Sequence, residues 1–261
     1  MSSQWAFSFG LGTLQRYIRQ MTFSGIGEAG QQRLGNSRVA IVGAGALGTV
    51  SANCLARAGV GFLRLIDKDS VERTNLHRQI LYIEDDADNN VPKVAAACAF
   101  LTRANSDIQL EPVVAELHAG NVESLFRDVD LVLDAVDHWG TRFLVNKICQ
   151  KTSLPWIYCA ALGAEGMTMN FLPNDPCLQC VVPRQTLGVQ PTCVTEGVLN
   201  MATGAIAAIQ AAEAIKILLG SPHIRRGLFV ADFWNNRFKT IPFEKDVQCP
   251  VCSASGRKKE V

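Results

Sequence analysis

The chain lacks three features that would assign it to a broad class by composition alone. Its charge is nearly balanced, with 25 Lys and Arg against 24 Asp and Glu, so a nucleic-acid-binding or polybasic membrane-binding surface is not expected. Its uncharged stretches, such as residues 197–212, are all shorter than the roughly 20 residues that a membrane-spanning helix needs. No basic region followed by an apolar segment marks a secretory signal at the start of the sequence. We therefore expect a cytoplasmic protein that binds neither nucleic acid nor membrane.

Internal repeats and low-complexity segments are also missing. Apolar residues make up 48% of the chain and charged residues 19%, which excludes a disordered or fibrous protein. A chain of 261 residues buries roughly three-quarters of its unfolded surface and needs no disulfides to stabilise its core. We predict a single domain over residues 1–261, with a helical arm (1–37), a core (38–176) and a C-terminal region (177–261).

Apolar runs of strand length alternate with helix-forming segments, which predicts an α/β fold. Helices are expected over 51–58, from about Pro92 onward and over 198–219, and the acidic segment 84–90 is expected to be a solvated, mobile connection. The alternation favours a Rossmann-like, largely parallel twisted sheet with flanking helices. The predicted strands are 38–42, 62–66, 108–114, 131–135, 156–160, 167–171, 227–231 and 238–242.

A glycine turn, Gly43-Ala44-Gly45-Ala46-Leu47-Gly48, follows the first predicted strand. In a strand–Gly-x-Gly-x-x-Gly–helix unit the glycines allow a tight turn and close backbone approach. The helix amino terminus then offers N–H groups and a positive dipole end to a phosphate. Asp67 ends the next strand, where an acidic side chain can bind ribose hydroxyls. The pattern indicates a nucleotide site, and the alternative is that the glycines serve only close packing.

Two cations follow this strand, Arg78 in Asn75-Leu76-His77-Arg78-Gln79 and Lys93 after Pro92. The pyrophosphate of a dinucleotide rests mainly on backbone N–H groups and needs little help from cations. A triphosphate carries about four negative charges, so arginine and lysine side chains suit it better. The alternative is that both residues are ordinary surface charges.

Asp137 follows the apolar strand 131–135, at the end of the sheet where ligands of α/β proteins bind. Magnesium prefers one or two carboxylates together with phosphate oxygens and water, so Asp137 is a candidate magnesium ligand. Two alternatives remain open at this point. Asp137 would instead cap the following helix, or it would pair locally with Arg142.

The nine cysteines require an explanation. In a reducing compartment cysteines stay as thiols, which bind metals or take part in catalysis rather than form disulfides. Cys177-Leu178-Gln179-Cys180 and Cys249-Pro250-Val251-Cys252 form two C-x-x-C motifs that predict a structural, tetrahedral zinc site. Closing the long loop between them costs about 4 kcal/mol. Binding of structural zinc contributes about 10–16 kcal/mol, which exceeds the cost of closing the loop. A redox function for either motif is the alternative.

Cys193 stands apart from these motifs, just before the long predicted helix. A cysteine near a helix amino terminus has a lowered thiol pKa, which suits a nucleophile. A buried, inert thiol is the alternative at this position.

In combination, these motifs resemble those of the ThiF/MoeB/HesA family, relatives of ubiquitin-activating enzymes. The family adenylates the carboxyl terminus of small β-grasp carrier proteins. The resemblance extends from about Arg16 to Cys252, and it also includes the segment Ala212 to Lys216. The motifs that carry it are Arg16-Tyr17-x-Arg19-Gln20, the glycine turn, Asp67-x-Asp69, Asn75-Leu-x-Arg78-Gln79, Pro92-Lys93, Asp137, the Cys193 segment with Glu196-Gly197, and both C-x-x-C motifs.

The resemblance implies a role for each of these motifs. It implies that ATP is a substrate, that the partner is a ubiquitin-like carrier ending in Gly-Gly, and that the enzyme is a homodimer. Arg19 would act in the partner's active site, Asp137 would hold Mg²⁺, and Cys193 would take part in sulfur transfer from a persulfide donor. The implied nucleotide-binding residues are Gly43, Gly45, Ala46, Gly48, Asp67, Asp69, Asn75, Arg78, Gln79, Lys93 and Asp137.

Three positions depart from the family pattern. Ala46 stands where many members have a third glycine, His138 where asparagine is frequent, and Gly163 in a stretch where bacterial relatives often have arginine. None of these changes removes Asp67, Arg78, Lys93 or Asp137, so we expect an active enzyme. Two other functions are considered alongside it, an NAD-dependent oxidoreductase and a non-catalytic scaffold held together by zinc.

Overall fold

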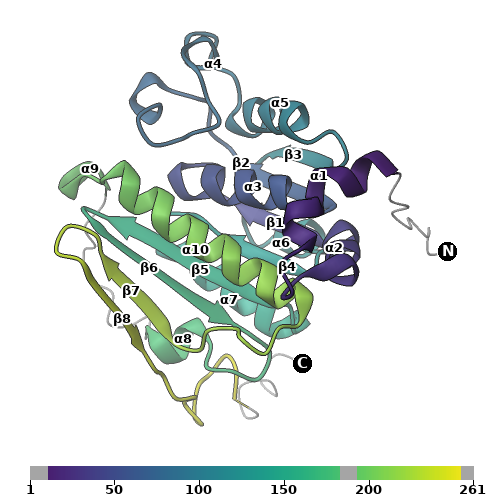
Figure 1. Ribbon diagram of the computed structural model, residues 1–261. Helices are drawn as coiled ribbons and strands as arrows, with labels where there is room; N and C mark the ends of the chain where they lie inside the picture. Colours follow the sequence, from purple (N-terminus) through teal and green to yellow (C-terminus); the bar gives the residue numbers. More distant parts are fainter. Residues whose placement is uncertain (1–10, 183–192, 254–261) are drawn as a thin grey trace.

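The computed structural model describes the backbone of residues 11–182 and 193–253. One eight-stranded sheet runs through this part of the chain in the order β3-β2-β1-β4-β5-β6-β7-β8 (Figure 1). β1 to β5 are parallel, whereas β6, β7 and β8 are antiparallel to their neighbours. The strands are β1 (Arg38–Val42), β2 (Phe62–Asp67), β3 (Gln109–Val114), β4 (Leu131–Asp134), β5 (Trp156–Leu162), β6 (Glu165–Phe171), β7 (Leu228–Asp232) and β8 (Arg237–Ile241).

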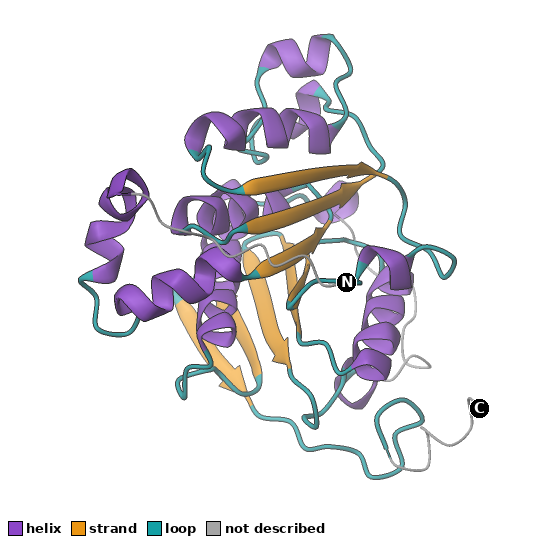
Figure 2. Ribbon diagram, turned by 90° about the vertical axis from the view of Figure 1, so that its right-hand side faces the viewer, coloured by secondary structure: helices purple, strands orange, loops and turns teal. Residues whose placement is uncertain are grey.

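Helices cover both faces of the sheet (Figure 2). α3 and α10 pack on one face together with α5, whereas α6 and α7 pack on the other. The helices are α1 (Leu11–Met21), α2 (Gly27–Asn36), α3 (Ala46–Ala58), the 3₁₀ turn η1 (Arg73–Asn75), α4 (Glu84–Asp88), α5 (Lys93–Ala104), α6 (Val122–Leu125), α7 (Trp139–Thr152), α8 (Leu178–Val181), α9 (Cys193–Glu196) and α10 (Asn200–Leu219).

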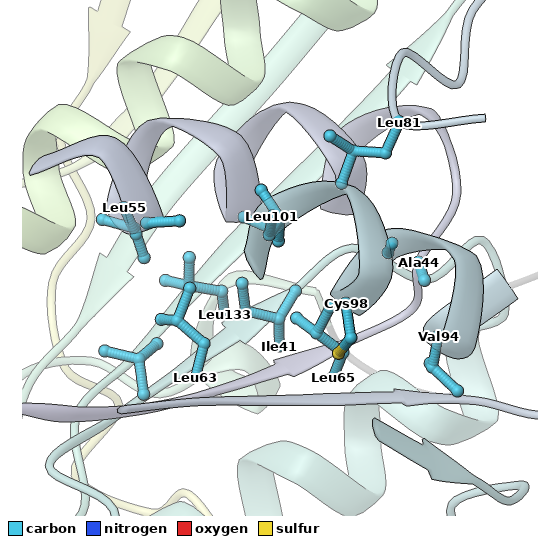
Figure 3. Close-up of a cluster of buried hydrophobic side chains, with 14 of the residues drawn as sticks. Ile41, Ala44, Leu55, Leu63, Leu65, Leu81, Val94, Cys98, Leu101 and Leu133 are labelled. Atoms are coloured by element: carbon cyan, nitrogen blue, oxygen red, sulfur yellow. The ribbon is translucent and has the colours of Figure 1, made fainter. Parts of the chain in front are cut away.

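The two-residue period of β1 explains how one strand supports both layers. Ile41 faces a core that contains Leu55 of α3 and Leu101 of α5 (Figure 3). The neighbouring Val42 belongs to the core on the opposite face, with Phe143 of α7. Because both faces are covered, the central strands β1, β4 and β5 read as nearly continuous apolar runs.

α10 has the length and the mean hydropathy, 1.5, that a membrane-spanning helix would need, and it alone does so among the described helices. Buried core helices of globular domains meet the same criteria. Here α10 lies across β5 and β6 and packs along α3. The buried residues of α10 include the polar Gln210 and Glu213, and each has hydrogen-bond partners inside the fold.

The predicted α/β fold with a largely parallel sheet is confirmed, and each predicted strand is present within two residues of its expected ends. Two expectations about helices were wrong. The helix after the glycine turn begins at Ala46, five residues earlier than expected, because Gly45 provides its N-terminal cap. The acidic segment 84–90 is not simply a solvated loop, since residues 84–88 form α4 and Arg73 pairs with Asp88 across the turn.

Gly61, the residue before β2, offers a test of how closely α2 approaches the sheet. A Cβ atom there would lie 1.8 Å from the backbone oxygen of Gly35, and neither backbone can yield cheaply. We expect Gly61→Ala to lower the free energy of unfolding by at least about 1–3 kcal/mol. Gly204→Ala is the matched control, because its Cβ would meet nothing within 4 Å and helical alanine gains about 0.5–1 kcal/mol. Thermal unfolding measures both, and an unchanged melting temperature for Gly61→Ala would contradict the packing.

Candidate functional site

A cleft of about 530 Å³ opens at the carboxyl ends of the parallel strands. The strand order reverses at β1, which has β2 on one side and β4 on the other, so the loops after these strands diverge and leave a crevice. Of the residues predicted to bind nucleotide, all but Gly48 line this cleft. They are Gly43, Gly45, Ala46, Asp67, Asp69, Asn75, Arg78, Gln79, Lys93 and Asp137.

The glycines of the turn have different structural roles. A Cβ on Gly48 would lie 1.9 Å from the Gly43 oxygen, so Gly48 allows the first turn of α3 to pack on the loop. A Cβ on Gly43 would lie 2.6 Å from the Ala135 oxygen, which also reflects close packing. Gly45 faces open space apart from one side-chain atom of Gln79 at 4.0 Å. The packing interpretation therefore holds for Gly43 and Gly48, while Gly45 leaves room for a ligand next to α3.

Asp67 is held rigidly at the end of β2. Its Oδ2 accepts a hydrogen bond from the Ala44 N–H at 2.7 Å, and its Oδ1 accepts one from the Asp69 N–H at 2.9 Å. The Ala44 carbonyl in turn accepts the hydroxyl of buried Tyr82 at 2.6 Å. Burial, with a smaller contribution from the charge of Asp67, raises the pKa of Tyr82 well above its usual value, so the phenol remains a donor. The glycine turn is thus fixed between a carboxylate and a phenol.

The two predicted cations reach the same cleft from separate segments. Lys93 begins α5 and is only 8% exposed, and its Nζ lies 3.1 Å from Oδ2 of Asp69. Arg78 follows η1 and donates from Nη1 to the Thr74 carbonyl at 2.9 Å. Both side chains line the cleft, so neither is an unrelated surface charge.

Asp137 is exposed in the cleft, and neither local alternative describes it. The N-terminal cap of α7 is His138, without a side-chain cap hydrogen bond. Arg142 pairs instead with Asp134, with Nε 3.3 Å from Oδ2. Burial raises the pKa of Asp134 to about 6, and the Arg142 guanidinium opposes this shift. The Asp137 carboxylate therefore faces the cleft and is available to a cation.

Sequence analysis did not predict the ion pair between Asp134 and Arg142, of which Arg142 lines the cleft. The signal was a carboxylate at the end of an apolar strand, followed eight residues later by an arginine in the next helix. The far wall of the cleft was also not predicted. It consists of small or short side chains from β5 and from the region around the start of α10, namely Ala160, Ala161, Val198 and Thr203.

The two C-x-x-C motifs meet away from the cleft. Sγ of Cys177 lies 3.6 Å from that of Cys249, and Sγ of Cys180 lies 3.5 Å from that of Cys252. All four sulfur atoms lie within 4.8 Å of one another. Thiolates around zinc at about 2.3 Å in a tetrahedron are about 3.8 Å apart, so the four cysteines fit a metal of this size.

Two predicted residues are placed outside the cleft. Arg19 lies exposed on α1 and does not line the cleft of its own chain. Its motif neighbours hold the helix in place, since Tyr17 is 3% exposed and its hydroxyl accepts a hydrogen bond from Asn105. Cys193 is the first residue of α9, and its side chain lies outside the described part of the structure.

The three departures from the family pattern take distinct positions. Ala46 and His138 line the cleft. Gly163 has a φ of +56° in the turn after β5, where it exchanges backbone hydrogen bonds with Gly197 and Leu199. These hydrogen bonds hold the segment that leads into α10 next to the end of β5, where Ala160 and Ala161 line the cleft.

Comparison with known proteins assigns this arrangement to a family. The model of the ThiF family matches residues 17–251. The chain belongs to the ThiF family.

Similar proteins share almost the whole length of this ThiF-family chain. The SAMP-activating enzyme E1 of Haloferax volcanii is 38% identical over 93% of this chain and 90% of its own. The sulfur carrier protein ThiS adenylyltransferase of Bacillus subtilis is 39% identical over 91% of this chain and 71% of its own. The sulfur carrier protein adenylyltransferase of Thermus thermophilus is 33% identical over 95% of this chain and 94% of its own. By this kinship the chain is an adenylyltransferase.

Solved structures agree on the fold. E. coli MccB with ATP superimposes with a TM-score of 0.79 over 91% of this chain and 74% of that one, at 22% identity. PaaA superimposes with a TM-score of 0.75 over 94% of this chain and 78% of that one, at 25% identity. The likeness to MccB concerns the fold alone at this identity.

Proposed function

We propose that this enzyme uses ATP to adenylate the C-terminal Gly-Gly carboxylate of a small, ubiquitin-like sulfur-carrier protein of the β-grasp fold. The single observation that supports this best is the cleft, which brings the glycine turn, Asp67, two cations and Asp137 together. The names of the relatives, which activate SAMP or ThiS, suggest the class of carrier. The small side chains at Ala160 and Ala161 suit a glycine-rich peptide tail.

In this proposal Asp67 binds the ribose, and the backbone near Gly45 approaches the phosphates. Arg78 and Lys93 neutralise the triphosphate and stabilise the charge that develops at its α-phosphorus. The carrier's terminal carboxylate attacks that phosphorus, forming an acyl adenylate and releasing pyrophosphate. The carboxylate is already ionised, so the enzyme need not remove a proton and acts by positioning and charge stabilisation.

Asp137 would hold a magnesium ion, because it is an exposed carboxylate that lines the cleft, and magnesium prefers one or two carboxylates together with phosphate oxygens and water. Magnesium bound there would offset phosphate charge. After adenylation, the Cys193 thiol would attack the acyl carbon and release AMP. Alternatively, it would take the outer sulfur of a persulfide donor, leaving the donor as a thiol, and that sulfur would attack the acyl carbon and release AMP. We expect these reactions to occur in the cytoplasm.

Pyrophosphate exchange into ATP tests adenylation directly. We expect carrier-dependent exchange with one member of a panel of carriers ending in Gly-Gly. Lys93→Met should reduce exchange at least about 100-fold, the usual loss when one donor to a developing charge is removed. Lys151→Met, at an exposed pair with Glu123, is the control and should keep wild-type exchange. Cys193→Ala should also retain exchange if Cys193 acts after adenylation.

The same preparations distinguish the two other functions. Tight NAD binding without Mg-ATP binding would favour an oxidoreductase and contradict adenylation. Mg-ATP binding without exchange, for every carrier tested, would favour a scaffold.

Zinc is the metal we propose for the four clustered cysteines, and it would be structural. Cys249→Ser should abolish zinc in the purified protein, measured by inductively coupled plasma mass spectrometry, and lower the melting temperature. Cys98→Ser is the control, because this buried core thiol lies outside the cluster and its loss should leave the zinc content unchanged. One zinc per chain retained in Cys249→Ser would refute the site.

A homodimer explains why Arg19 is exposed on α1 and absent from the cleft of its own chain, because it would complete the partner's cleft. Arg19→Ala and Asp137→Ala should each be inactive. Mixed with subunit exchange, they should recover up to about a quarter of wild-type activity, since one cleft of each hybrid dimer is intact. Asp137→Ala mixed with Lys93→Ala is the control and should not recover, because every cleft then carries a defect. No recovery in the first mixture, with hybrids demonstrated, would exclude action across the dimer.

A further inference from the structure

The segment from Ala135 to His138 connects β4 to α7 and carries Asp137. Its conformation depends on two buried side chains that the proposed mechanism does not use. Asp134 is fully buried at the end of β4, and Arg142, in the second turn of α7, is 5% exposed. Together, these two side chains bind the backbone N–H and the backbone carbonyl of one residue, Val136.

Val136 immediately precedes Asp137, and two different side chains bind its two backbone groups. Its N–H donates to Oδ1 of Asp134 at 3.0 Å, and its carbonyl accepts from Nη2 of Arg142 at 2.6 Å. The two charged groups meet through Nε and Oδ2 at 3.3 Å, an ion-pair contact without hydrogen-bond alignment. The ion pair thus closes a ring around the backbone that leads into Asp137.

The ring is itself attached to rigid elements. Nη2 of Arg142 also lies 3.3 Å from the Cys159 carbonyl of β5, and its guanidinium lies over the rings of Trp139 and Tyr158 at 4.9 and 4.8 Å. Gln210 of α10 donates to the Asp134 carbonyl at 2.9 Å. The position of Asp137 relative to β5 and α10 is therefore set by these contacts and not by the loop alone.

Stability does not explain why a charged pair occupies this place. Desolvating two charges usually costs as much as their attraction returns, and apolar replacements of buried pairs are often neutral or stabilising. What an apolar pair could not do is bind the N–H and the carbonyl of Val136 together. Arg142 also lines the cleft, so the ring adjoins the reacting groups.

Given the proposed function, on which this rests, we propose that Asp134 and Arg142 are positioning residues. They fix the Val136–Asp137 backbone so that the Asp137 carboxylate meets the metal ion of bound nucleotide. The pair itself touches neither metal nor substrate in this assignment. Partners that orient a metal ligand typically change metal affinity by about 10- to 100-fold when replaced.

The test compares ATP binding with magnesium and with EDTA, by isothermal titration calorimetry on the full chain. The measured quantity is the ratio of the two dissociation constants, which reports the metal-dependent part of the affinity. We expect Arg142→Lys to reduce this ratio about 10-fold or more, while the affinity in EDTA changes less than twofold. Asp134→Asn, which keeps the side-chain shape, should have the same effect and provides a second variant if Arg142→Lys does not fold.

Arg64→Lys is the matched control. Arg64 is also buried, pairs with Glu111 at 3.0 Å and donates to the Leu125 carbonyl at 2.8 Å, but it does not line the cleft. A purely structural effect of losing a buried guanidinium would lower the melting temperature of both arginine variants. Only the change at Arg142 should alter the magnesium-dependent ratio.

Folded variants whose ratio stays within twofold of wild type would overturn the inference. An equal loss of affinity with and without magnesium would overturn it as well, because the pair would then shape the whole cleft. A wild-type affinity that is independent of magnesium would overturn it together with the role of Asp137. Adenylation itself is judged separately by pyrophosphate exchange, so the failure of one does not imply the failure of the other.

Discussion

The side chain of Gln210 joins the elements that form the cleft. Its Nε2 donates to the carbonyls of Asp134 and Ile157, at 2.9 and 3.0 Å, and its Oε1 accepts the Ser51 hydroxyl at 2.8 Å. β4 and β5 pair over only two residue pairs and then separate, which would leave these buried carbonyls without partners. An unpaired buried carbonyl costs about 1–3 kcal/mol, and the two hydrogen bonds from the Gln210 amide remove this cost where the strands separate. The amide thus joins the ends of β4 and β5 where their pairing stops, beside the crevice that the reversal of strand order at β1 leaves.

Charges in the cleft are arranged so that each cation already has a partner before a nucleotide binds. Lys93 is paired with Asp69, and Arg78 is held by the Thr74 carbonyl. A buried ammonium without a counter-ion would lose its charge or destabilise the fold. Asp69 therefore supplies a counter-charge for Lys93 and holds its side chain at the cleft. The carboxylate of Asp67 is fixed in the same way by the N–H groups of Ala44 and Asp69.

Features encoded in neighbouring residues could be predicted from the sequence. The glycine turn, Asp67 and the C-x-x-C motifs each depend on local spacing, and the structure brings the expected residues to one cleft and one cysteine cluster. The partner of Arg142 could not be predicted, because spacing permits both Asp134 and Asp137. Burial decides between them, since the fully desolvated carboxylate needs a counter-charge and the solvated one does not. Gln210 was missed for a related reason: one amide in an alanine-rich helix gives no sign of the carbonyls it meets.

The cysteine cluster has a structural connection to the cleft, although the two lie apart. Cys177 caps α8 and Cys180 lies within it, and the Leu178 N–H donates to Oδ1 of Asn146, a buried residue of α7, at 2.9 Å. Arg142 precedes Asn146 by one helical turn on the same helix. The other two cysteines follow β8, so the cluster brings the segment after the antiparallel strands next to α8, which contacts α7. Because α7 also supplies the arginine that binds Val136, the contact with α8 and the Asp134–Arg142 pair both involve the same face of α7, one turn apart. The orientation of Asp137 then depends on the packing of α7 as a whole, which local sequence around Asp137 does not encode.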